Sequence, residues 1–310
     1  MPAVDVKGLK KNYGKVIALR GISFSAEKGE IFGIIGPDGS GKTTLFRILT
    51  TLLVADEGTA VVDGFDVVKD YKEIRKRVGY MPGRFSLYQD LTVEENLQFF
   101  ASVFHTTIEE NYDLVKDIYS QIEPFKTRRA GKLSGGMKQK LALSCALIHK
   151  PAILFLDEPT TGVDPVSRKE LWEMLKRLKN QGITILVSTP YMDEAALCDR
   201  IALIKDGRFL SIDTPANITA QFNQKIFAVR GLEMSRLLSD IRAFPAVKTC
   251  YAFGDSHHVT VETGQNELQE SVQHALYLYL LFKGHTNVEI EKINPGIEDC
   301  FMELTKADVV

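Results

Sequence analysis

The sequence predicts an α/β fold for roughly its first two thirds and a small α+β domain for the remainder. Up to about residue 210, apolar runs of strand length alternate with helical patterns. Four of these runs are apolar at nearly every position, which is typical of parallel strands covered by helices on both faces. The four runs span residues 30–35, 78–81, 152–156 and 183–188. Beyond about residue 214 the order of strands and helices changes, which indicates a second domain.

The other elements of the first domain carry local signals. Residues 5–9 and 16–25 precede the first apolar run and are typical of antiparallel strands. Thr92 and Glu95 have the spacing of a capping box, so we expect a helix to begin there and to run through about Phe104. Asp164 precedes Pro165, which pairs a capping carboxylate with proline at the first helical position.

The tail, residues 215–310, predicts a small ferredoxin-like α+β module. After a short helix, the expected order is strand, helix, strand, strand, helix, strand, which is the order of that module. Strands are expected at residues 225–230, 247–252, 258–262 and 288–292, and helices at 234–243 and 268–282. The paired histidines of this tail have no ligand spacing around them, so we expect surface or packing residues.

Composition narrows the function classes. A chain of 310 residues with 45% hydrophobic and 25% charged residues is typical of a globular protein of about two domains. The 38 Lys+Arg and 40 Asp+Glu residues leave a net charge of −2. Because proteins that coat nucleic acid normally carry a basic excess, we expect no nucleic-acid partner.

Two further patterns indicate a soluble, intracellular protein. No window holds 18 uninterrupted apolar residues, and residues 1–14 lack the apolar stretch of a signal peptide. The four cysteines stand far apart and form no C-x-x-C pair, so neither a metal site nor a disulfide framework is expected. We expect Cys145, Cys198, Cys250 and Cys300 to be small buried side chains in a reducing cytosol.

A glycine-rich loop follows the first apolar run and predicts a phosphate site. It reads Gly36, Pro37, Asp38, Gly39, Ser40, Gly41, Lys42 and Thr43, which fits the pattern G-x-x-x-x-G-K-[ST], and a helix is expected to begin near Thr44. Glycines allow backbone N–H groups to turn toward phosphate oxygens, the helix N-terminus adds partial positive charge, and Lys42 adds a full one. The alternative is a glycine-rich turn with an incidental lysine.

Two carboxylates follow the third apolar run. Asp157 and Glu158 come directly after residues 153–156, so they are expected at the carboxyl end of a buried strand, where open α/β sheets bind ligands. In that place Asp157 would hold Mg²⁺ and Glu158 would polarise an attacking water. Many strands end in acidic residues, so the pair is a strong signal only beside the phosphate loop.

A third motif opens a helix whose core-facing residues include Leu143, Ala146 and Leu147. Leu133 is followed by Ser134, Gly135, Gly136 and Met137. A hydroxyl and unobstructed backbone N–H groups at a helix N-terminus make a second anion site. The alternative is an ordinary serine-capped helix.

Together the three motifs resemble the nucleotide-binding subunit of an ABC transporter, over about residues 4–215. Tyr13, ahead of the phosphate loop, and the run Gly162-Val163-Asp164 also match that family. The resemblance implies a P-loop cassette over residues 1–214, with a mixed core sheet, an antiparallel β subdomain and a helical subdomain at about 84–150. It also implies ATP as ligand, stacked on Tyr13, and Mg²⁺ held by Thr43 and Asp157, with Glu158 as the catalytic residue.

The resemblance further implies partners. In the family, two cassettes form a head-to-tail dimer in which residues 134–136 of one subunit reach the γ-phosphate held by the other. ATP would close such a dimer and hydrolysis would reopen it. Integral-membrane subunits would couple through residues 84–104, which places the chain on the cytoplasmic face of the cell membrane. Residues 295–305 resemble the accessory region of drug-export-type subunits, so the implied direction of transport is export.

Two family positions are changed. The family has glutamine after the second apolar run and histidine after the fourth, and this chain has Gly83 and Pro190. Neither residue offers a side-chain donor, and the loss of one donor from an active site costs on the order of 10²–10³ in rate. The sequence therefore predicts a site that binds ATP and hydrolyses it slowly, unless Gln89 substitutes for the missing glutamine.

Several alternatives stay open at this point. The two changes are tolerated variations, or this chain forms an asymmetric dimer with a partner whose own site does the hydrolysis. Whether the dimer is homo- or heteromeric also stays open. A regulatory nucleotide-binding subunit is the third alternative. A non-transport ABC protein that acts as an ATP-gated clamp is a fourth, although such proteins usually carry paired cassettes, coiled-coil insertions or basic arms. The transported substrate is chosen by membrane subunits, so this sequence does not specify it.

Overall fold

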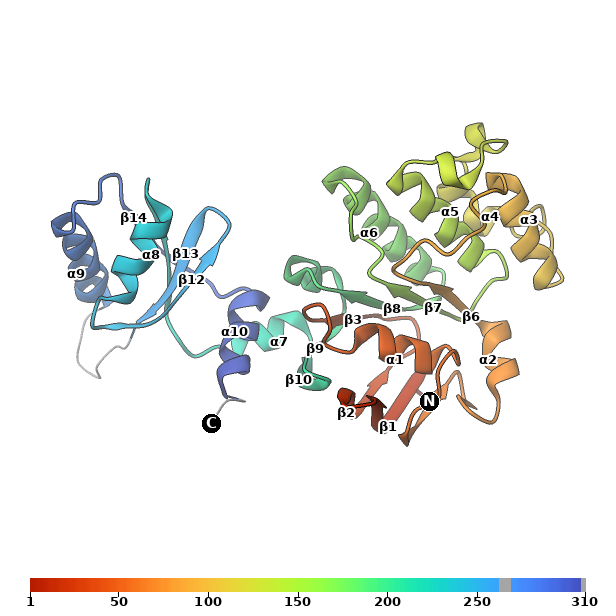
Figure 1. Cartoon of the computed structure of the whole chain (residues 1–310), viewed down its shortest axis with the longest axis horizontal. Helices are drawn as coiled ribbons and strands as arrows, with labels where there is room; N and C mark the ends of the chain where they lie inside the picture. The colour runs from red at the N-terminus through yellow and green to blue at the C-terminus, as the bar shows by residue number, and fades with distance from the viewer. Residues whose placement is uncertain (262–268, 308–310) are drawn as a thin grey trace. The chain divides into compact units, whose positions relative to one another are not determined.

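The computed structural model describes residues 1–261 and 269–307, which belong to two units, Met1–Ala216 and Asn217–Val310. A six-stranded sheet in the order β10-β9-β3-β8-β7-β6 organises the first unit (Figure 1). Its strands are β3 (Ile31–Ile35), β6 (Val78–Met81), β7 (Ile153–Asp157), β8 (Thr184–Thr189), β9 (Arg200–Lys205) and β10 (Arg208–Asp213).

Five strands of this sheet are parallel to their neighbours, and β10 alone is antiparallel, to β9. All four apolar runs of the sequence form β3, β6, β7 and β8, and every residue of β3, β7 and β8 is buried. Such strands need helices on both faces. Figure 1 shows α1 (Lys42–Leu49) on one face and α5 (Gly135–Leu147) and α6 (Pro165–Asn180) on the other. The predicted α/β fold with a mixed core sheet is confirmed.

A second, antiparallel sheet packs under α1, in the order β2-β1-β4-β5. Its strands are β1 (Val4–Tyr13), β2 (Val16–Ala26), β4 (Glu57–Val62) and β5 (Phe65–Asp66), followed by α2 (Tyr71–Arg77). The two sheets share one hydrophobic core: Phe24 of β2 stacks on Phe32 of β3, with ring centroids 5.2 Å apart, and Phe46 of α1 meets Phe155 of β7. The phosphate loop is therefore anchored on both sheets.

Short helices fill the region between β6 and β7. They are α3 (Val93–Val103), α4 (Tyr112–Tyr119), η1 (Glu123–Phe125), η2 (Ala130–Lys132) and α5, and η3 (Met192–Leu197) follows β8. The expected capping box is present: Thr92 Oγ1 accepts from Glu95 N at 3.1 Å and Glu95 Oε2 accepts from Thr92 N at 2.7 Å. Asn96, fully buried, donates to the carbonyl oxygens of Tyr88 and Thr92 and so ties the segment before α3 to the helix.

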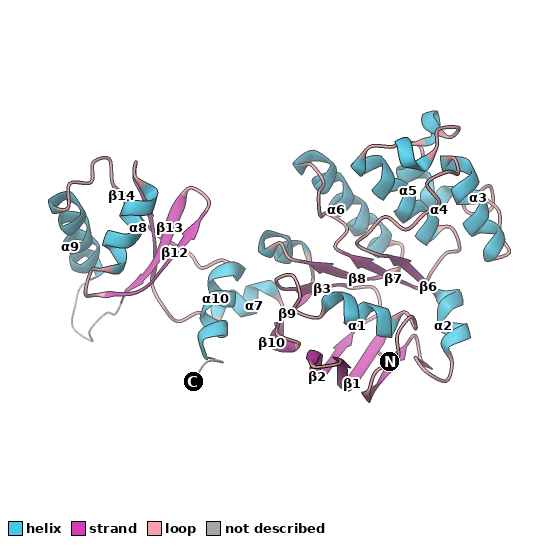
Figure 2. Cartoon of the chain, in the orientation of Figure 1, coloured by secondary structure: helices cyan, strands magenta, loops and turns pink. Residues whose placement is uncertain are grey.

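The second unit has a four-stranded antiparallel sheet in the order β12-β13-β11-β14 (Figure 2). Its elements are α7 (Pro215–Ala220), which begins at the boundary, β11 (Ile226–Arg230), α8 (Met234–Arg242), β12 (Val247–Phe253), β13 (Ser256–Val261), α9 (Gln269–Phe282), β14 (Glu289–Ile293) and α10 (Ile297–Ala307). Between β11 and β14 the elements follow the predicted order of strand, helix, strand, strand, helix, strand. Phe227, Leu237, Val259 and Leu276 form the centre of its core.

Some predicted bounds differ from the structure. β13 begins at Ser256, two residues before the predicted strand, whose last residue, Glu262, lies outside the described residues. The first residue of the predicted helix 268–282, Leu268, also lies outside them, and α9 is described from Gln269. No periodicity argument assigned a helix to residues 297–307, where the structure has α10.

Two further expectations concern the cysteines and membrane spans. All four cysteines are buried and free, as predicted, and burial raises the pKa of the Cys145 and Cys198 thiols. Within the described residues, none of the helices has both the length and the apolar composition required to cross a membrane.

We predict that Thr92→Ala destabilises α3. The substitution removes the side-chain acceptor of the capping box and costs about 1 kcal/mol, so amide exchange in the first turn of α3 should become about fivefold faster. Hydrogen exchange read by mass spectrometry measures this. Ser102→Ala is the matched control, because the Ser102 hydroxyl donates to the Phe99 carbonyl oxygen within the same helix at 2.7 Å. Equal exchange in the two variants would show that the cap does not stabilise α3.

Candidate functional site

Four loops meet at one edge of the central sheet because their strands are parallel and in register. Ile35 pairs with Thr189, Asp157 pairs with Ser188, and Met81 of β6 pairs with Leu156. The carboxyl ends of β3, β8, β7 and β6 therefore lie side by side. This edge holds the glycine-rich loop, Pro190, Glu158 and Gly83, which come from distant parts of the sequence. It is the place where open α/β sheets bind their ligands.

The glycine-rich loop connects β3 to α1, and two of its glycines have no room for a side chain. A Cβ on Gly36 would lie 2.1 Å from the carbonyl oxygen of Ile204, and one on Gly41 would lie 2.5 Å from that of Ala18. Gly41 has φ 108° and stands at the N-cap of α1, where no side chain caps the helix and the first turn holds no acidic residue. The N–H groups of that turn are thus directed at the loop, as an anion site requires.

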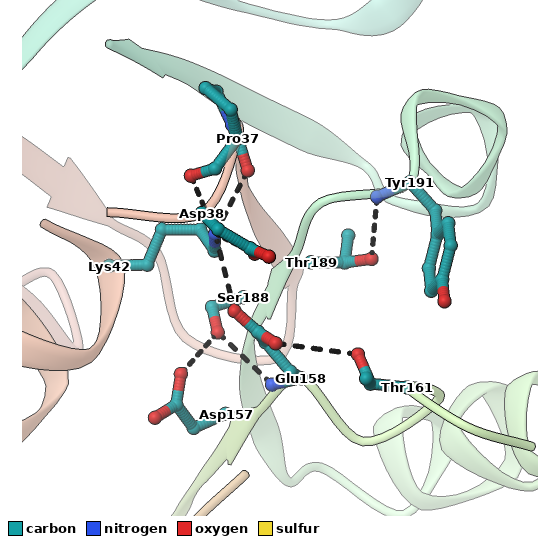
Figure 3. A network of polar contacts seen from close by, with 10 residues as sticks. Pro37, Asp38, Lys42, Asp157, Glu158, Thr161, Ser188, Thr189 and Tyr191 are labelled. Atoms are coloured by element: carbon teal, nitrogen blue, oxygen red, sulfur yellow. Dashed lines mark hydrogen bonds and ion pairs between the residues drawn. The ribbon is translucent and has the colours of Figure 1, made fainter. Parts of the chain in front are cut away.

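Lys42 connects this loop to the carboxylates (Figure 3). Its side chain is only 3% exposed, and its ammonium donates to the carbonyl oxygens of Gly36 at 2.9 Å and Pro37 at 3.0 Å. The same Nζ lies 3.3 Å from Glu158 Oε1 and 3.9 Å from Asp38 Oδ1. Ser40 is also buried, and within the described residues its hydroxyl has no hydrogen-bond partner. The loop thus offers one fixed cation and one unused polar group.

The two carboxylates differ in their surroundings. Asp157 is 2% exposed, and its Oδ1 accepts a hydrogen bond from Ser188 Oγ at 2.6 Å. Glu158 is partly exposed and has φ 51°, a left-handed conformation that costs free energy for a residue with a side chain. Its N–H donates to both the carbonyl and the hydroxyl oxygen of Ser188, and its Oε2 accepts from Thr161 Oγ1 at 3.4 Å. Glu158 is thereby turned toward Lys42.

Tyr80 lies on β6, the strand next to β7, and contributes no charge to the site. Burial, together with the negative charge of Asp157, raises the pKa of Tyr80 to about 12. The phenol is therefore neutral at physiological pH. Lys42, Asp157 and Glu158 carry the charge at the centre of the site.

The residues of the third motif lie against the loop after Glu158. Ser134 caps α5, with its Oγ accepting from Met137 N at 3.4 Å, and a Cβ on Gly136 would lie 3.4 Å from Ser167 Oγ. Asp164 caps α6 by accepting from the N–H groups of Val166 and Ser167, and these bonds, that from Ser167 first, hold the pKa of Asp164 below its usual range. Two helix N-termini are thus brought together, and Ser134 and Asp164 are both exposed.

The structure does not bring these N-termini to the phosphate loop. Across residues 1–261 and 269–307, no hydrogen bond or ion pair joins residues 134–136 to residues 36–43. Tyr13 is nearer to the loop. It ends β1 opposite Val16 and is 45% exposed, and Ala18, on the same β2 strand as Val16, touches Gly41.

The two changed positions lie at the centre of the site. A Cβ on Gly83 would be 3.1 Å from the carbonyl oxygen of Asp157 and 3.7 Å from Glu158 Cβ, so a side chain there would begin beside the backbone that carries both carboxylates. Pro190 directly follows Thr189 at the end of β8. Gln89 lies elsewhere: its carbonyl oxygen accepts from Gly131 N at 2.9 Å, and its side chain packs against Gly131. Within the described parts of the chain, the contacts of Gln89 are with the helical region and not with the carboxylates.

Sequence reasoning did not single out Ser188 and Thr161, which touch the carboxylates. Their signal was present: Ser188 and Thr189 are polar residues that end a strand otherwise apolar, and such residues face ligands at this edge of a sheet. Without the pairing of β7 with β8, the partner of Ser188 was not known.

A separate groove of about 530 Å³ opens between β6, α1, α2, α3 and α5. Apolar side chains dominate it, including Leu87, Phe100 and Phe104, with Arg47 and Arg75 among the polar ones. His149 stacks on Phe104 with ring centroids 3.8 Å apart, and burial lowers the pKa of its imidazole, which keeps the ring neutral. The groove is thus a largely apolar surface next to the segment after β6.

Comparison with known proteins identifies what this arrangement is similar to. Residues 19–161 match a family model described as "ABC transporter". The chain is 34% identical over 308 residues to the Nod factor export ATP-binding protein I of Rhizobium sp. (strain N33), covering 98% of this chain and 97% of that protein. It is 36% identical over 307 residues to the probable multidrug ABC transporter ATP-binding protein YbhF of Escherichia coli (strain K12). That match covers 97% of this chain and 52% of the relative, so the chain spans about half the length of YbhF.

A solved structure is similar to the first unit. The bacterial ABC transporter cassette MJ0796, described as dimeric, aligns with a TM-score of 0.63 at 27% sequence identity. The alignment covers 68% of this chain and 98% of that cassette.

We predict that Gly36→Ala displaces the phosphate loop. A Cβ at 2.1 Å from a backbone oxygen forces the main chain to move, and a misplacement of about 1 Å in a binding site costs on the order of 10² in affinity or rate. Titration with a fluorescent ATP analogue measures the loss. Gly64→Ala is the control, because Gly64 has φ 84° but open space around it, so it tests backbone strain alone. Similar affinities for both variants would contradict the steric argument.

Proposed function

The chain belongs to the ABC transporter family of ATP-binding cassettes, and from that premise we propose that it hydrolyses ATP to power export across a membrane through separate integral-membrane subunits. One observation carries the proposal: the glycine-rich loop, Lys42 and the pair Asp157 and Glu158 converge at one sheet edge, where Lys42 Nζ lies 3.3 Å from Glu158 Oε1. This arrangement places two carboxylates beside a phosphate-binding loop, as phosphoryl transfer to water requires.

The first role belongs to the phosphate loop. Residues 36–44 wrap the phosphates with backbone N–H groups of the loop and of the first turn of α1. Gly36 and Gly41 fit this task because any side chain there would strike the backbone behind the loop. Lys42 exchanges its contact with Glu158 for phosphate oxygens, and Tyr13 offers a half-exposed ring to the adenine base.

A metal site follows from the oxygen donors beside the loop. Thr43 and Asp157 would hold Mg²⁺, since a hydroxyl and a carboxylate are oxygen ligands that this ion prefers. When bound, the ion would neutralise charge on the phosphate oxygens. The Ser188 bond occupies Asp157 Oδ1 and directs the second carboxylate oxygen away from Ser188.

Glu158 is the proposed catalytic residue. It is more exposed than Asp157, and its backbone is held by Ser188 and its carboxylate by Thr161. A carboxylate so placed can accept a hydrogen bond from a water and orient that water toward the terminal phosphate. The left-handed backbone of Glu158 fits a functional position, because strain of this kind persists where the surrounding structure enforces it.

A second cassette completes the site. Ser134 and Gly135 are exposed and Gly136 is half-buried, and the two glycines lie near Gly162 and Ser167, which flank Asp164. We propose that residues 134–136 bind the γ-phosphate held by a partner subunit, so that ATP joins two chains head to tail. The dimeric cassette MJ0796 supports this arrangement.

The integral-membrane partner docks in the apolar groove beside α3. The groove includes Leu87, Phe100 and Phe104, which all belong to the segment 84–104. A short apolar segment of a membrane subunit would bury these side chains, and the chain would work on the cytoplasmic face of the membrane. The names of the two relatives, which refer to Nod factor export and to multidrug transport, support export as the direction.

Gly83 and Pro190 favour a slow site in an asymmetric pair. Gly83 adjoins Asp157 and Glu158, Pro190 follows the end of β8, and neither residue has a side-chain hydrogen-bond donor. Residues 134–136 and Asp164, in contrast, match the family. In this arrangement the chain serves mainly to complete its partner's site. The second candidate function, a regulatory nucleotide-binding subunit, rests on the same two residues.

We predict that Pro190→His raises the rate of ATP hydrolysis by the purified chain. A restored donor near the γ-phosphate is worth on the order of 10²–10³ in rate, and phosphate release measures it. Gly83→Gln should gain less, because its Cβ crowds the Asp157 carbonyl oxygen at 3.1 Å. Adding Glu158→Gln to Pro190→His should remove the gain.

Two outcomes of that assay decide between the proposals. If the unaltered chain hydrolyses ATP as fast as the Pro190→His variant, and Glu158→Gln abolishes that rate, the asymmetric arrangement is wrong. If the unaltered chain binds no ATP at all, the proposed function itself fails.

We also predict that Phe100→Glu separates the chain from its membrane partner. A charge in the apolar groove opposes docking, so recovery of the chain with the membrane subunits in pull-downs from detergent extracts should fall at least about tenfold. ATP binding should be unchanged. Val103→Glu is the matched control, because Val103 lies on the same helix, is 52% exposed and does not line the groove. Equal loss in both variants would contradict docking at this surface.

A further inference from the structure

We propose that Ser188 is the positioning residue that sets both carboxylates of the site and thereby its affinity for the metal-bound nucleotide. The inference rests on the proposed function, in which Asp157 is a metal ligand and Glu158 the catalytic residue. None of the sequence motifs includes Ser188. It follows from three contacts that the Ser188 side chain and carbonyl make with Asp157, the last residue of β7, and with Glu158, the residue after it.

The Ser188 hydroxyl both donates and accepts within the carboxylate pair (Figure 3). Its Oγ donates to Asp157 Oδ1 at 2.6 Å and accepts from the N–H of Glu158 at 3.1 Å. The Ser188 carbonyl oxygen accepts from the same N–H at 3.0 Å. A hydroxyl is required for this pattern, because only a group with both a donor and acceptor lone pairs can serve a carboxylate and an amide together.

The position of Ser188 in the sheet makes these contacts rigid. β8 lies between β3, which leads into the phosphate loop, and β7, which ends in Asp157. Ser188 pairs with Ile34 on one side and with Asp157 on the other. Both Ser188 and Asp157 are almost fully buried, at 0% and 2% exposed. A buried, short hydrogen bond to a carboxylate is among the stronger ones in proteins, since its acceptor is charged.

Each contact has a consequence for one carboxylate. The bond to Oδ1 fixes the rotation of the Asp157 carboxylate, so the second oxygen keeps one direction. It is also the only hydrogen bond that this carboxylate accepts within the described parts of the chain. The bond to the Glu158 N–H supports a residue whose φ of 51° is unfavourable for a side-chain-bearing residue.

Gly83 increases the importance of Ser188. A side chain at position 83 would begin 3.7 Å from Glu158 Cβ and 3.1 Å from the Asp157 carbonyl oxygen, but glycine provides none. The orientation of the Asp157 carboxylate then depends on the contact from β8, and the Glu158 backbone depends on it as well. A merely structural serine would stabilise the strand pairing without changing metal affinity, and this difference is measurable.

The test compares nucleotide binding with and without metal in the full chain. Ser188→Ala removes the hydroxyl and leaves the strand intact. We expect its affinity for a fluorescent ATP analogue in EDTA to stay within about twofold of the unaltered chain. We expect its Mn²⁺ affinity in the presence of ATP, read by electron paramagnetic resonance, to fall about tenfold, the loss that one hydrogen bond to a charged group produces.

Thr184→Val is the matched control. Thr184 is a buried residue on the same strand, and its hydroxyl accepts from Gly29 N at 3.0 Å, at the end of β8 away from the carboxylates. The Thr184→Val variant loses one buried hydrogen bond, whereas Ser188→Ala loses two, so the control reports the cost of a purely structural bond. We expect unchanged Mn²⁺ affinity in this variant.

Ser188→Thr and Ser188→Cys keep the proposal testable if the alanine variant does not fold. Threonine keeps the hydroxyl and should retain Mn²⁺ affinity, whereas cysteine has nearly the same shape but donates weakly and should lose it. The proposal is overturned if Ser188→Ala binds Mn²⁺ like the unaltered chain, or if it loses as much affinity in EDTA as with metal. Absence of any ATP binding by the unaltered chain would instead refute the proposed function.

Discussion

The parallel register of β3, β8 and β7 is the constraint on which the rest of the site depends. Because Ile35 lies opposite Thr189 and Asp157 opposite Ser188, the strands end at the same level. A shift of β7 by one residue would move Asp157 out of line with Ser188 and break the hydrogen bond between their side chains. The same register brings Lys42 to 3.3 Å from Glu158, although 116 positions of the chain, 158 − 42, separate them.

The motifs could be read from the sequence because each is contiguous and local. The phosphate loop combines its glycines with the start of one helix, and the caps at Thr92, Ser134 and Asp164 each need only the three residues that follow. The α/β fold followed from the alternation of strand-length apolar runs and helical patterns. Predicted elements differ from the observed ones mainly at their ends, where fraying and capping decide by one or two residues.

Contacts between distant segments could not be read in the same way. Ser188 carries no motif, and its role follows only from the pairing of β8 with β7. Gln89 is close to Gly83 in sequence, yet its contacts are with Gly131, because residues 88–92 turn back along the helical region. By contrast, the apolar residues of α10, Ile297, Cys300, Phe301 and Leu304, have helical spacing, so this helix could have been read from the sequence. The contacts of Ser188 and Gln89 depend on tertiary partners.

The contact between Gly36 and Ile204 has a practical consequence for dissecting this chain. The wall behind the phosphate loop is the backbone of β9, which is 168 positions later in the sequence than Gly36, 204 − 36. A fragment trimmed after the last nucleotide motif, near residue 165, would keep every motif residue and lose both β8 and β9. Such a fragment would keep every residue of the nucleotide-binding motifs but would lack the β9 backbone against which the phosphate loop packs. The smallest fragment that can bind nucleotide on its own therefore extends at least through residue 205, well beyond the last nucleotide-binding motif.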